Sequence, residues 1–198
     1  DVAPSRGLGD VYKRQALKSQ LGKILLVFPT HSFEDCDDLY DFNQFSQCID
    51  EMAKDYDTVL ISMIGYDIQQ GFDKKYRNKG YRIVSSGTRN DPYFLNRQRD
   101  LMELADMTIS NNIGTHIGYS ICLGTPHYIF NQDITSIKKA ASAQASDHLQ
   151  AIRDREYAEI KAVFNSREPI ITPEQIAVVK KYWGPFEIKP KFYANTQE

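Results

Sequence analysis

Five short runs of apolar and β-branched residues alternate with segments of helical spacing, and this alternation constrains the fold of the chain more than any other feature. A run such as KILLVFP is typical of a strand that is buried on both faces of a parallel sheet. Strands that alternate with helices form right-handed β-α-β units. We therefore predict an α/β fold, a doubly wound parallel sheet of about five strands with a C-terminal helical extension. The runs are Lys23–Pro29, Thr58–Met63, Tyr81–Ser85, Met107–Ser110 and His127–Phe130.

Helical segments are expected between and after these runs. Asp91 followed by Pro92 is an N-cap with proline at the first helical position, and predicts a helix through Leu104. Thr172-Pro173 repeats this pattern near the C-terminus, where Gly184 is a predicted stop. Other helices are predicted from the apolar repeat Phe42, Phe45, Ile49 and Met52, over Ile68–Asn78, over Ile117–Leu123, and within Ile134–Phe164, which carries no strand signal.

The chain divides into three expected parts. Residues Ser5–Gln15 show neither helical nor strand periodicity, and they resemble translated sequencing-adapter sequence at the edge of an assembled fragment. We expect residues 1–15 to be a non-native leader, with the natural protein continuing upstream of Ala16. Residues 16–133 are the predicted Rossmann-like domain. Residues 134–198 are expected to form helices that pack on it or on a partner domain.

Composition excludes several classes of protein. A net charge of −2 over 198 residues argues against a broad nucleic-acid surface. No apolar run approaches the length of a membrane span, and the three cysteines show no C-x-x-C pairing, so a soluble cytoplasmic protein is expected. The chain has no G-x-S-x-G elbow, Walker loop or H-E-x-x-H motif, which removes the usual support for those hydrolase and NTPase classes.

The densest polar cluster follows the fourth predicted strand, in the stretch ADMTISNNIGTHIGYSICLGTPHYIF (105–130). In a parallel sheet, ligands bind beyond the carboxyl ends of strands, where loops lead into helix N-termini. Side chains and N–H groups here suit phosphate or sugar hydroxyls, and His116 either bonds a phosphate or stays neutral and orients a hydroxyl. The alternative is simple helix capping. The candidate ligand-binding residues are Ser110, Asn111, Asn112, Gly114, Thr115 and His116.

Two further loops reach the same predicted edge. After the first strand, His31, Ser32, Glu34 and Asp35 could hold a sugar or act as acid and base, or form only a solvated capping loop. The spacing of these carboxylates matches no closed metal site. After the third strand, Ser86 and Arg89 are candidates, because a guanidinium pairs well with a diphosphate. His127 at a strand start is interpreted as structural, and Tyr182-Trp183 as the anchor of the last helix.

The 105–130 block resembles the donor-binding C-terminal half of GT-B glycosyltransferases, closest to members encoded in bacterial capsular and surface polysaccharide clusters. In that pattern a strand ending in Ser/Thr-Asn/Asp leads to a Gly-containing loop, a helix and a Leu-Gly-x-Pro turn. Here these elements are Ser110-Asn111, Gly114-Thr115 and Leu123–Pro126. The likeness covers Lys23 to about Trp183, with only the quoted block being specific.

The resemblance implies a nucleotide-sugar donor at this edge and a glycan acceptor brought by an N-terminal Rossmann-like half that is missing from this chain, with the enzyme peripheral to the inner membrane. It implies neither a cofactor nor a metal requirement. The catalytic candidates are His31, Glu34 and His116. Retaining members and nucleotide-sugar 2-epimerases carry a carboxylate early in the helix after the glycine loop, where this chain has His116–Tyr119.

Sialyltransferase-like GT-B proteins instead use His- and Ser/Thr-containing loops around a cytidine nucleotide, which Pro29–Ser32 and Thr115-His116 resemble. The expected function is therefore donor binding in transfer of a sugar to a growing surface glycan. The alternatives are a non-catalytic Rossmann-like binding or assembly module and a nucleotide-sugar isomerase, the latter disfavoured by the missing carboxylate.

Overall fold

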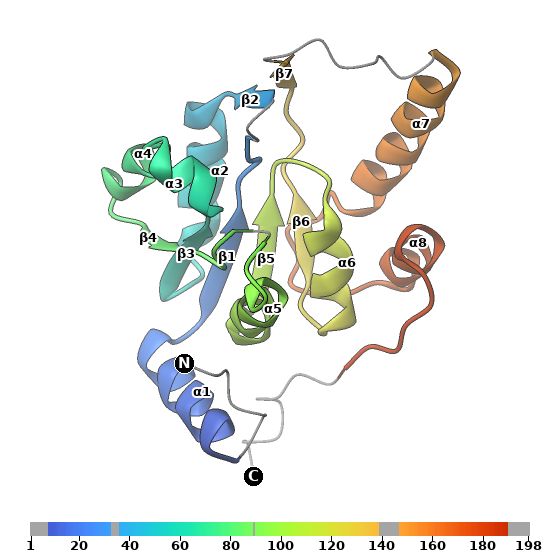
Figure 1. Cartoon of the computed structure of the whole chain (residues 1–198). Coiled ribbons are helices and arrows are strands. Elements are labelled where there is room, and N and C mark those ends of the chain that lie inside the picture. Colours follow the sequence, from blue (N-terminus) through green and yellow to red (C-terminus); the bar gives the residue numbers. More distant parts are fainter. Residues whose placement is uncertain (1–7, 33–35, 89, 139–146, 190–198) are drawn as a thin grey trace.

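The computed structural model, which describes residues 8–32, 36–88, 90–138 and 147–189, is an α/β protein built on a parallel sheet (Figure 1). The sheet has five strands in the order β4-β3-β1-β5-β6, and every neighbouring pair is parallel. The predicted fold class is confirmed. The strands are β1 (Ile24–Phe28), β3 (Thr58–Ser62), β4 (Arg82–Val84), β5 (Met107–Ser110) and β6 (His127–Ile129).

The strand order reverses direction at β1. The chain adds β3 and β4 on one side of β1, then returns to add β5 and β6 on the other side. The order is that of a Rossmann-like sheet, in which ligands bind at the crevice where the winding reverses. The fold therefore places the natural crevice beyond the carboxyl ends of β1 and β5.

Alternate residues of β1 enter different cores. Leu25 and Val27 pack with Phe45 and Ile49 of α2 (Phe42–Ala53). Ile24 and Leu26 pack with residues of α5 (Phe94–Leu104) on the opposite face. A strand covered on both faces must be apolar at every position, which explains the continuous ILLVF run.

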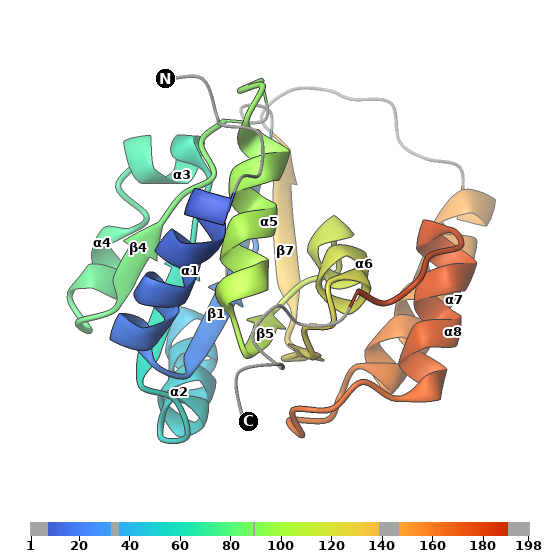
Figure 2. The ribbon, with the colours of Figure 1, turned by 90° about the horizontal axis from the view of Figure 1, so that it is seen from below.

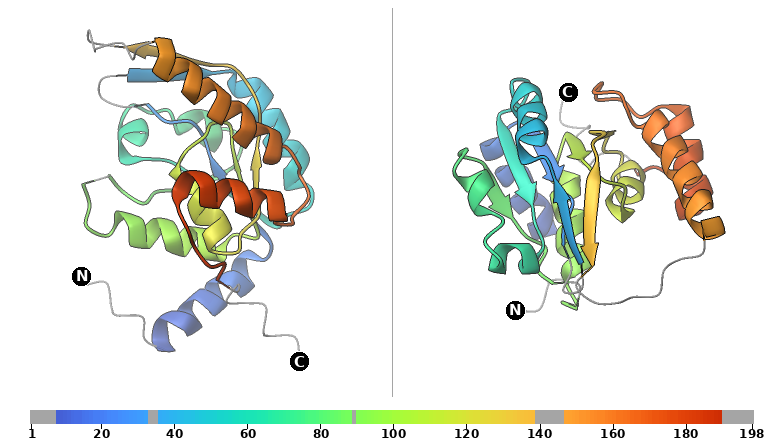
Figure 3. Two further views of the ribbon diagram at one scale, coloured as in Figure 1. Left: turned by 90° about the vertical axis from the view of Figure 1, so that its right-hand side faces the viewer. Right: turned by 90° about the horizontal axis from the view of Figure 1, so that it is seen from above.

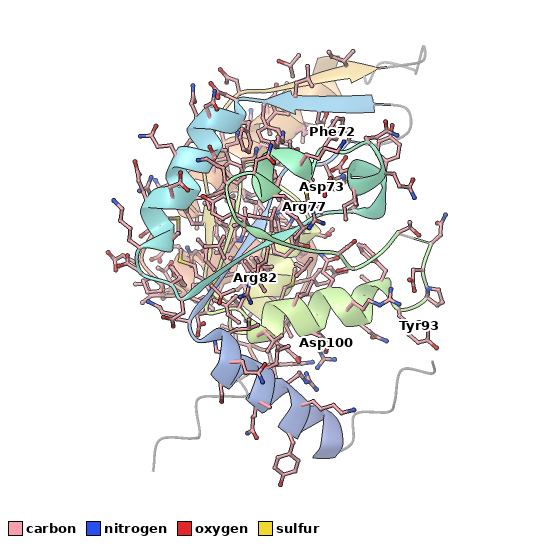
Figure 4. All side chains as sticks on the ribbon, turned by 90° about the vertical axis from the view of Figure 1, so that its left-hand side faces the viewer. Phe72, Asp73, Arg77, Arg82, Tyr93 and Asp100 are labelled. Atoms are coloured by element: carbon pink, nitrogen blue, oxygen red, sulfur yellow. The ribbon has the colours of Figure 1, made fainter. Side chains whose placement is uncertain are left out.

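Helix α1 (Leu8–Leu21) lies along α5 (Figure 2). Arg14 pairs with Glu103, and Arg14 Nη1 also lies 3.5 Å from Asp100 Oδ1, on the side of α5 that faces α1 (Figure 4). Residues 5–15 show no helical periodicity in the sequence, yet the chain is helical from Leu8 onward, in a helix whose own apolar pattern is weak and that is joined to α5 by ion pairs. The assignment of residues 1–15 as a non-native leader stays a prediction.

A second, two-stranded antiparallel sheet lies above the parallel one and joins β2 (Cys36–Tyr40) to β7 (Ile134–Lys138). We predicted a polar loop at the first of these strands and no strand at the second, and both predictions are wrong. Each strand is short, and its partner lies roughly a hundred residues away, so the pairing leaves little local signal.

Two predicted helices also differ from the structure. The segment 68–78 forms two short helices, α3 (Gly65–Gln69) and α4 (Lys74–Arg77), with Gly71 between them at φ +78°. Arg77 of α4 pairs with Asp73, the residue before the helix (Figure 4). Helix α5 begins at Phe94 rather than at Pro92, because Asp91 accepts a hydrogen bond from the Tyr93 N–H at 2.8 Å in a turn before the helix.

The C-terminal helices α7 (Asp147–Val163) and α8 (Pro173–Trp183) pack beside α6 (Thr115–Cys122) (Figure 3). Thr172 caps α8 in a capping box with Gln175, and Gly184 follows the last helical residue, as predicted. Trp183 lies directly on Gly118 of α6, which confirms its role as an anchor. In the described parts of the chain, no helix combines the length and apolar character needed to cross a membrane.

Candidate functional site

A pocket of about 330 Å³ opens at the carboxyl edge of the sheet, across the reversal point of the strand order. That volume is at the lower end of the range for small-molecule sites. The loops after β1, β3, β4 and β5 all contribute to its walls, together with α5 and one residue of β2. The lining residues are Phe28, Pro29, Thr30, His31, Asp38, Ser62, Met63, Ile64, Ser86, Phe94, Gln98, Asn112, Ile113, Gly114, Thr115 and His116.

The wall formed by the β5–α6 loop contains four of the six residues predicted there: Asn112, Gly114, Thr115 and His116. Gly114 is the N-cap of α6 in an extended conformation that any residue adopts, so its need for glycine is one of space. A Cβ on Gly114 would lie 2.8 Å from both Cε1 and Nδ1 of His116. The missing side chain lets His116 fold back beside the loop.

His116 is held as a neutral imidazole. Its ring stacks on Phe28, with centroids 5.0 Å apart and an interplanar angle of 19°. Burial and the nearby His31 lower the pKa of His116 from 6.5 to about 3, against the opposing effect of a hydrogen bond to the backbone of Asn112. Nε2 is buried and has no hydrogen-bond partner among the described residues. Nδ1 is the ring nitrogen nearer the β5–α6 loop, because a Cβ on Gly114 would lie 2.8 Å from Nδ1 and 4.0 Å from Nε2, so we assign the interaction with the Asn112 backbone to Nδ1.

Ser110 lies behind this wall and is not a pocket residue. It is fully buried, and its hydroxyl donates to the Asn112 carbonyl at 2.7 Å. Its Oγ lies 3.0 Å from His127 Nε2, and His127 Nδ1 lies 2.8 Å from Thr108 Oγ1. Both ring nitrogens of His127 are therefore satisfied inside the core, which confirms the structural interpretation of this histidine. Burial, and secondarily His116, lower the pKa of His127 well below its usual value.

Asn111 and Asn112, in the loop after β5, both form hydrogen bonds to the loop after β1. Asn111 is buried, and its Oδ1 accepts a hydrogen bond from the Thr30 N–H at 2.6 Å. Asn112 Nδ2 donates to Thr30 Oγ1 at 3.0 Å. Asn111 does not line the pocket. Its hydrogen bond connects the β5 loop to the β1 loop behind the pocket wall.

The β1 loop contributes His31 to the pocket, whereas Ser32 lies outside the lining. Ser32 is buried; its Oγ accepts a hydrogen bond from the Asp38 N–H at 3.2 Å, and its own N–H donates to Asp67 Oδ1 at 3.3 Å. Ser32 therefore holds the loop in shape. Glu34, a predicted catalytic candidate, and Asp35 lie outside the described residues.

The β4 loop supplies Ser86. This residue lines the pocket with only 4% of its surface exposed, and its Oγ has no hydrogen-bond partner among the described residues. Arg89, predicted as a diphosphate partner, lies outside the described residues. Ser86 and His116 both line the pocket, and each has a buried polar atom with no hydrogen-bond partner among the described residues. In natural proteins such an atom typically binds a ligand or an ordered water.

The sequence reasoning missed several lining residues. Asp38 belongs to β2, and it is held at the pocket because β2 pairs with β7. This long-range pairing has no local signal in the sequence. Gln98 and Phe94 come from the N-terminal half of α5. Ser62 sits at the end of β3 and could have been found from its strand-end position alone.

The lining is mixed polar and apolar, and it is almost uncharged. Among the described lining residues, Asp38 is the one carboxylate, and there is no lysine or arginine. Such a surface suits a ligand with many hydroxyl groups. An anionic group would be held by the N–H groups of Thr115 and His116 at the start of α6, whereas the Ile117 N–H already donates to the Gly114 carbonyl.

No three His, Cys, Asp or Glu side chains gather closely enough to hold a metal ion in the described part of the chain. Comparison of the chain with protein-family models, with curated proteins and with solved structures finds no match in any of the three.

Proposed function

We propose that this chain is the donor-binding half of a GT-B-type glycosyltransferase, and that it binds a nucleotide-sugar in the pocket at the carboxyl edge of the sheet. The observation that supports the proposal best is the position of the pocket. It lies at the reversal point of a Rossmann-like strand order and takes its walls from four successive strand-end loops.

The phosphates of the donor would lie at the start of α6. Thr115 is exposed there and offers a hydroxyl, next to N–H groups that point out of the helix. Because the described lining has no cation, these neutral donors and the helix dipole would carry the stabilisation of the departing nucleotide phosphate. No metal ion is required in this arrangement.

The sugar and ribose hydroxyls would be held by the remaining polar wall. Asp38 is an acceptor, and Gln98 and Ser86 can donate or accept. Phe94 offers an apolar surface on the same side. His31 lines the pocket and is our candidate for acid-base chemistry, while a second Rossmann-like half would bring the glycan acceptor, as the family resemblance implies.

A ligand screen tests this proposal. The melting temperature of the chain is measured with CMP, UDP, GDP and their nucleotide-sugars, and isothermal titration calorimetry follows for any member that raises it. We expect one nucleotide class to bind. Failure of every member would overturn the proposal and favour a non-catalytic module.

Two variants locate the binding. Thr115→Ala should weaken the affinity for the bound nucleotide about tenfold, because a hydrogen bond to a charged phosphate is lost. Tyr119→Ala is the matched control, because Tyr119 lies one turn further along α6, is 44% exposed and does not line the pocket. Unchanged affinity in Thr115→Ala would place the phosphate elsewhere.

A further inference from the structure

The hydrogen-bond pattern around His116 defines what this residue can offer a ligand. A neutral imidazole carries one N–H and one lone pair. Nδ1 of His116 is the ring nitrogen on the side of the β5–α6 loop, where the Asn112 backbone lies, so we assign the N–H to Nδ1. The buried Nε2 then carries the lone pair, and it has no partner among the described residues. A phosphate oxygen is also an acceptor and cannot satisfy it.

We propose that His116 Nε2 accepts a hydrogen bond from a hydroxyl group of the bound ligand, and so selects for a ligand that carries a ribose or sugar hydroxyl at this point. The inference rests on the proposed function and deepens it, since it assigns His116 to hydroxyl recognition instead of phosphate binding. Ser86 Oγ, which is also buried and unpartnered, is the second contact from the opposite wall.

The surroundings of His116 fix the orientation of its ring, and so which ring nitrogen is free to bond a ligand. Its ring is held by the stack on Phe28 and by the close approach of Gly114, so a rotation that exchanges the two nitrogens would break the bond to Asn112. Burial keeps the imidazole neutral across the physiological range. Other groups that titrate nearby are His31 and Asp38 in the pocket wall and His127, whose ring centroid lies 5.4 Å away; α5 contributes only Phe94 and Gln98 to the lining.

The test is a double-mutant cycle that combines a change in the ligand with a change at His116. The nucleotide that binds best in the screen is compared with its 2′-deoxy and 3′-deoxy forms, and its nucleotide-sugar with deoxy-sugar forms. These two arms separate a ribose hydroxyl from a sugar hydroxyl. Each ligand is titrated into the unaltered chain, into His116→Phe, which keeps an aromatic ring on Phe28, and into His116→Gln, which keeps an acceptor.

We expect removal of one particular hydroxyl to weaken binding roughly tenfold in the unaltered chain and in His116→Gln, and to have no effect in His116→Phe. The ratio of the affinities of the unaltered chain and His116→Phe should stay constant between pH 8 and pH 5, and contributions from His31 and Asp38 cancel in this ratio. In the chain labelled with ¹⁵N, the Nε2 resonance should move on ligand binding while His116 stays neutral.

Two results would overturn the inference while leaving the proposed function intact. One is an equal loss of affinity for every ligand in His116→Phe, deoxy forms included. The other is a His116-dependent rise in affinity between pH 7 and pH 5, which would show an imidazolium bound to phosphate. If no nucleotide or nucleotide-sugar binds at all, the proposed function fails and this inference fails with it.

Discussion

The Oγ of Ser110 lies 3.0 Å from Nε2 of His127, and this contact joins the ligand-site loop to the interior of the protein. The serine hydroxyl donates to the carbonyl of Asn112, and on its other side His127 Nδ1 lies 2.8 Å from Thr108 Oγ1. The β5–α6 loop, which forms one wall of the pocket, is therefore held in place by a buried polar chain and by the main chain together.

Replacement of Ser110 by alanine should destabilise the protein by about 1–3 kcal/mol, because His127 Nε2 would lose its hydrogen-bond partner inside the core. Urea unfolding followed by circular dichroism measures the free energy of unfolding. Thr115→Ala, at an exposed position five residues along, is the control and should change it by less than about 0.5 kcal/mol. Equal stability of Ser110→Ala and the unaltered chain would contradict the buried network.

Gly118 packs against the face of Trp183, and an added Cβ would lie 2.7 Å from Trp183 Cγ. Alanine normally stabilises a helix interior relative to glycine, by about 1 kcal/mol. Here we expect Gly118→Ala to lower the free energy of unfolding by about 1–3 kcal/mol, because α8 must move away from α6.

A second substitution isolates the cause. In the background Trp183→Leu the ring is absent, so Gly118→Ala should become neutral or stabilising in a double-mutant cycle. A destabilisation that persists in this background would show that the α6–α8 contact is not its origin.

The positions of the sheet strands could be predicted from the sequence because both faces of each central strand are buried. β1 has no polar position, and its boundaries follow from the run itself. The same reasoning fails for β2, whose sequence CDDLY contains no apolar run, and for α1, whose apolar pattern is weak and which forms ion pairs with Glu103 of α5 and with Asp106.

The candidate site was predicted only in part, for a related reason. Residues that follow a strand could be placed at the sheet edge, but not which of them face a cavity. Ser110, Asn111 and Ser32 have the polarity of ligand contacts and instead serve the protein itself. Thr125 of the Leu-Gly-x-Pro turn behaves likewise, since its hydroxyl donates to the Met102 carbonyl at 3.0 Å and is fully buried.

His116 and His127, whose pKa values are both lowered, should make the protein sensitive to mild acid. The pKa of His116 falls to about 3 and that of His127 also falls well below 6.5, so the folded state binds fewer protons than the unfolded state. Stability is then fully present above pH 6.5 and is lost as the pH decreases below it, by up to about 1.4 kcal/mol per pH unit for each histidine.

Urea unfolding at pH 7.5, 6.5 and 5.5 measures this loss. Carboxylates with a lowered pKa, such as Asp91 and Glu159, do not contribute to a change in stability over this pH range, because they stay ionised throughout it. His116→Phe should show about half of the dependence of the unaltered chain, since His127 remains. A free energy of unfolding that does not change over this range in the unaltered chain would contradict the burial of neutral histidines.

Asp38 is the one carboxylate among the described lining residues of the pocket. If it accepts hydroxyl groups of the donor, Asp38→Asn should weaken binding of the nucleotide-sugar about tenfold and leave the nucleotide without its sugar almost unaffected. Calorimetric titration of both ligands into both proteins measures the two ratios.

Asp38→Asn keeps the size of the side chain, and the backbone N–H of Asp38 that donates to Ser32 is unchanged, so the loop should hold its shape. The sign of the effect is decisive. Tighter binding of the nucleotide in Asp38→Asn would mean that the carboxylate repels a nearby phosphate, because opposite charges attract and like charges repel most strongly at short range. The phosphates would then lie on the β1–β2 side of the pocket and not at the start of α6.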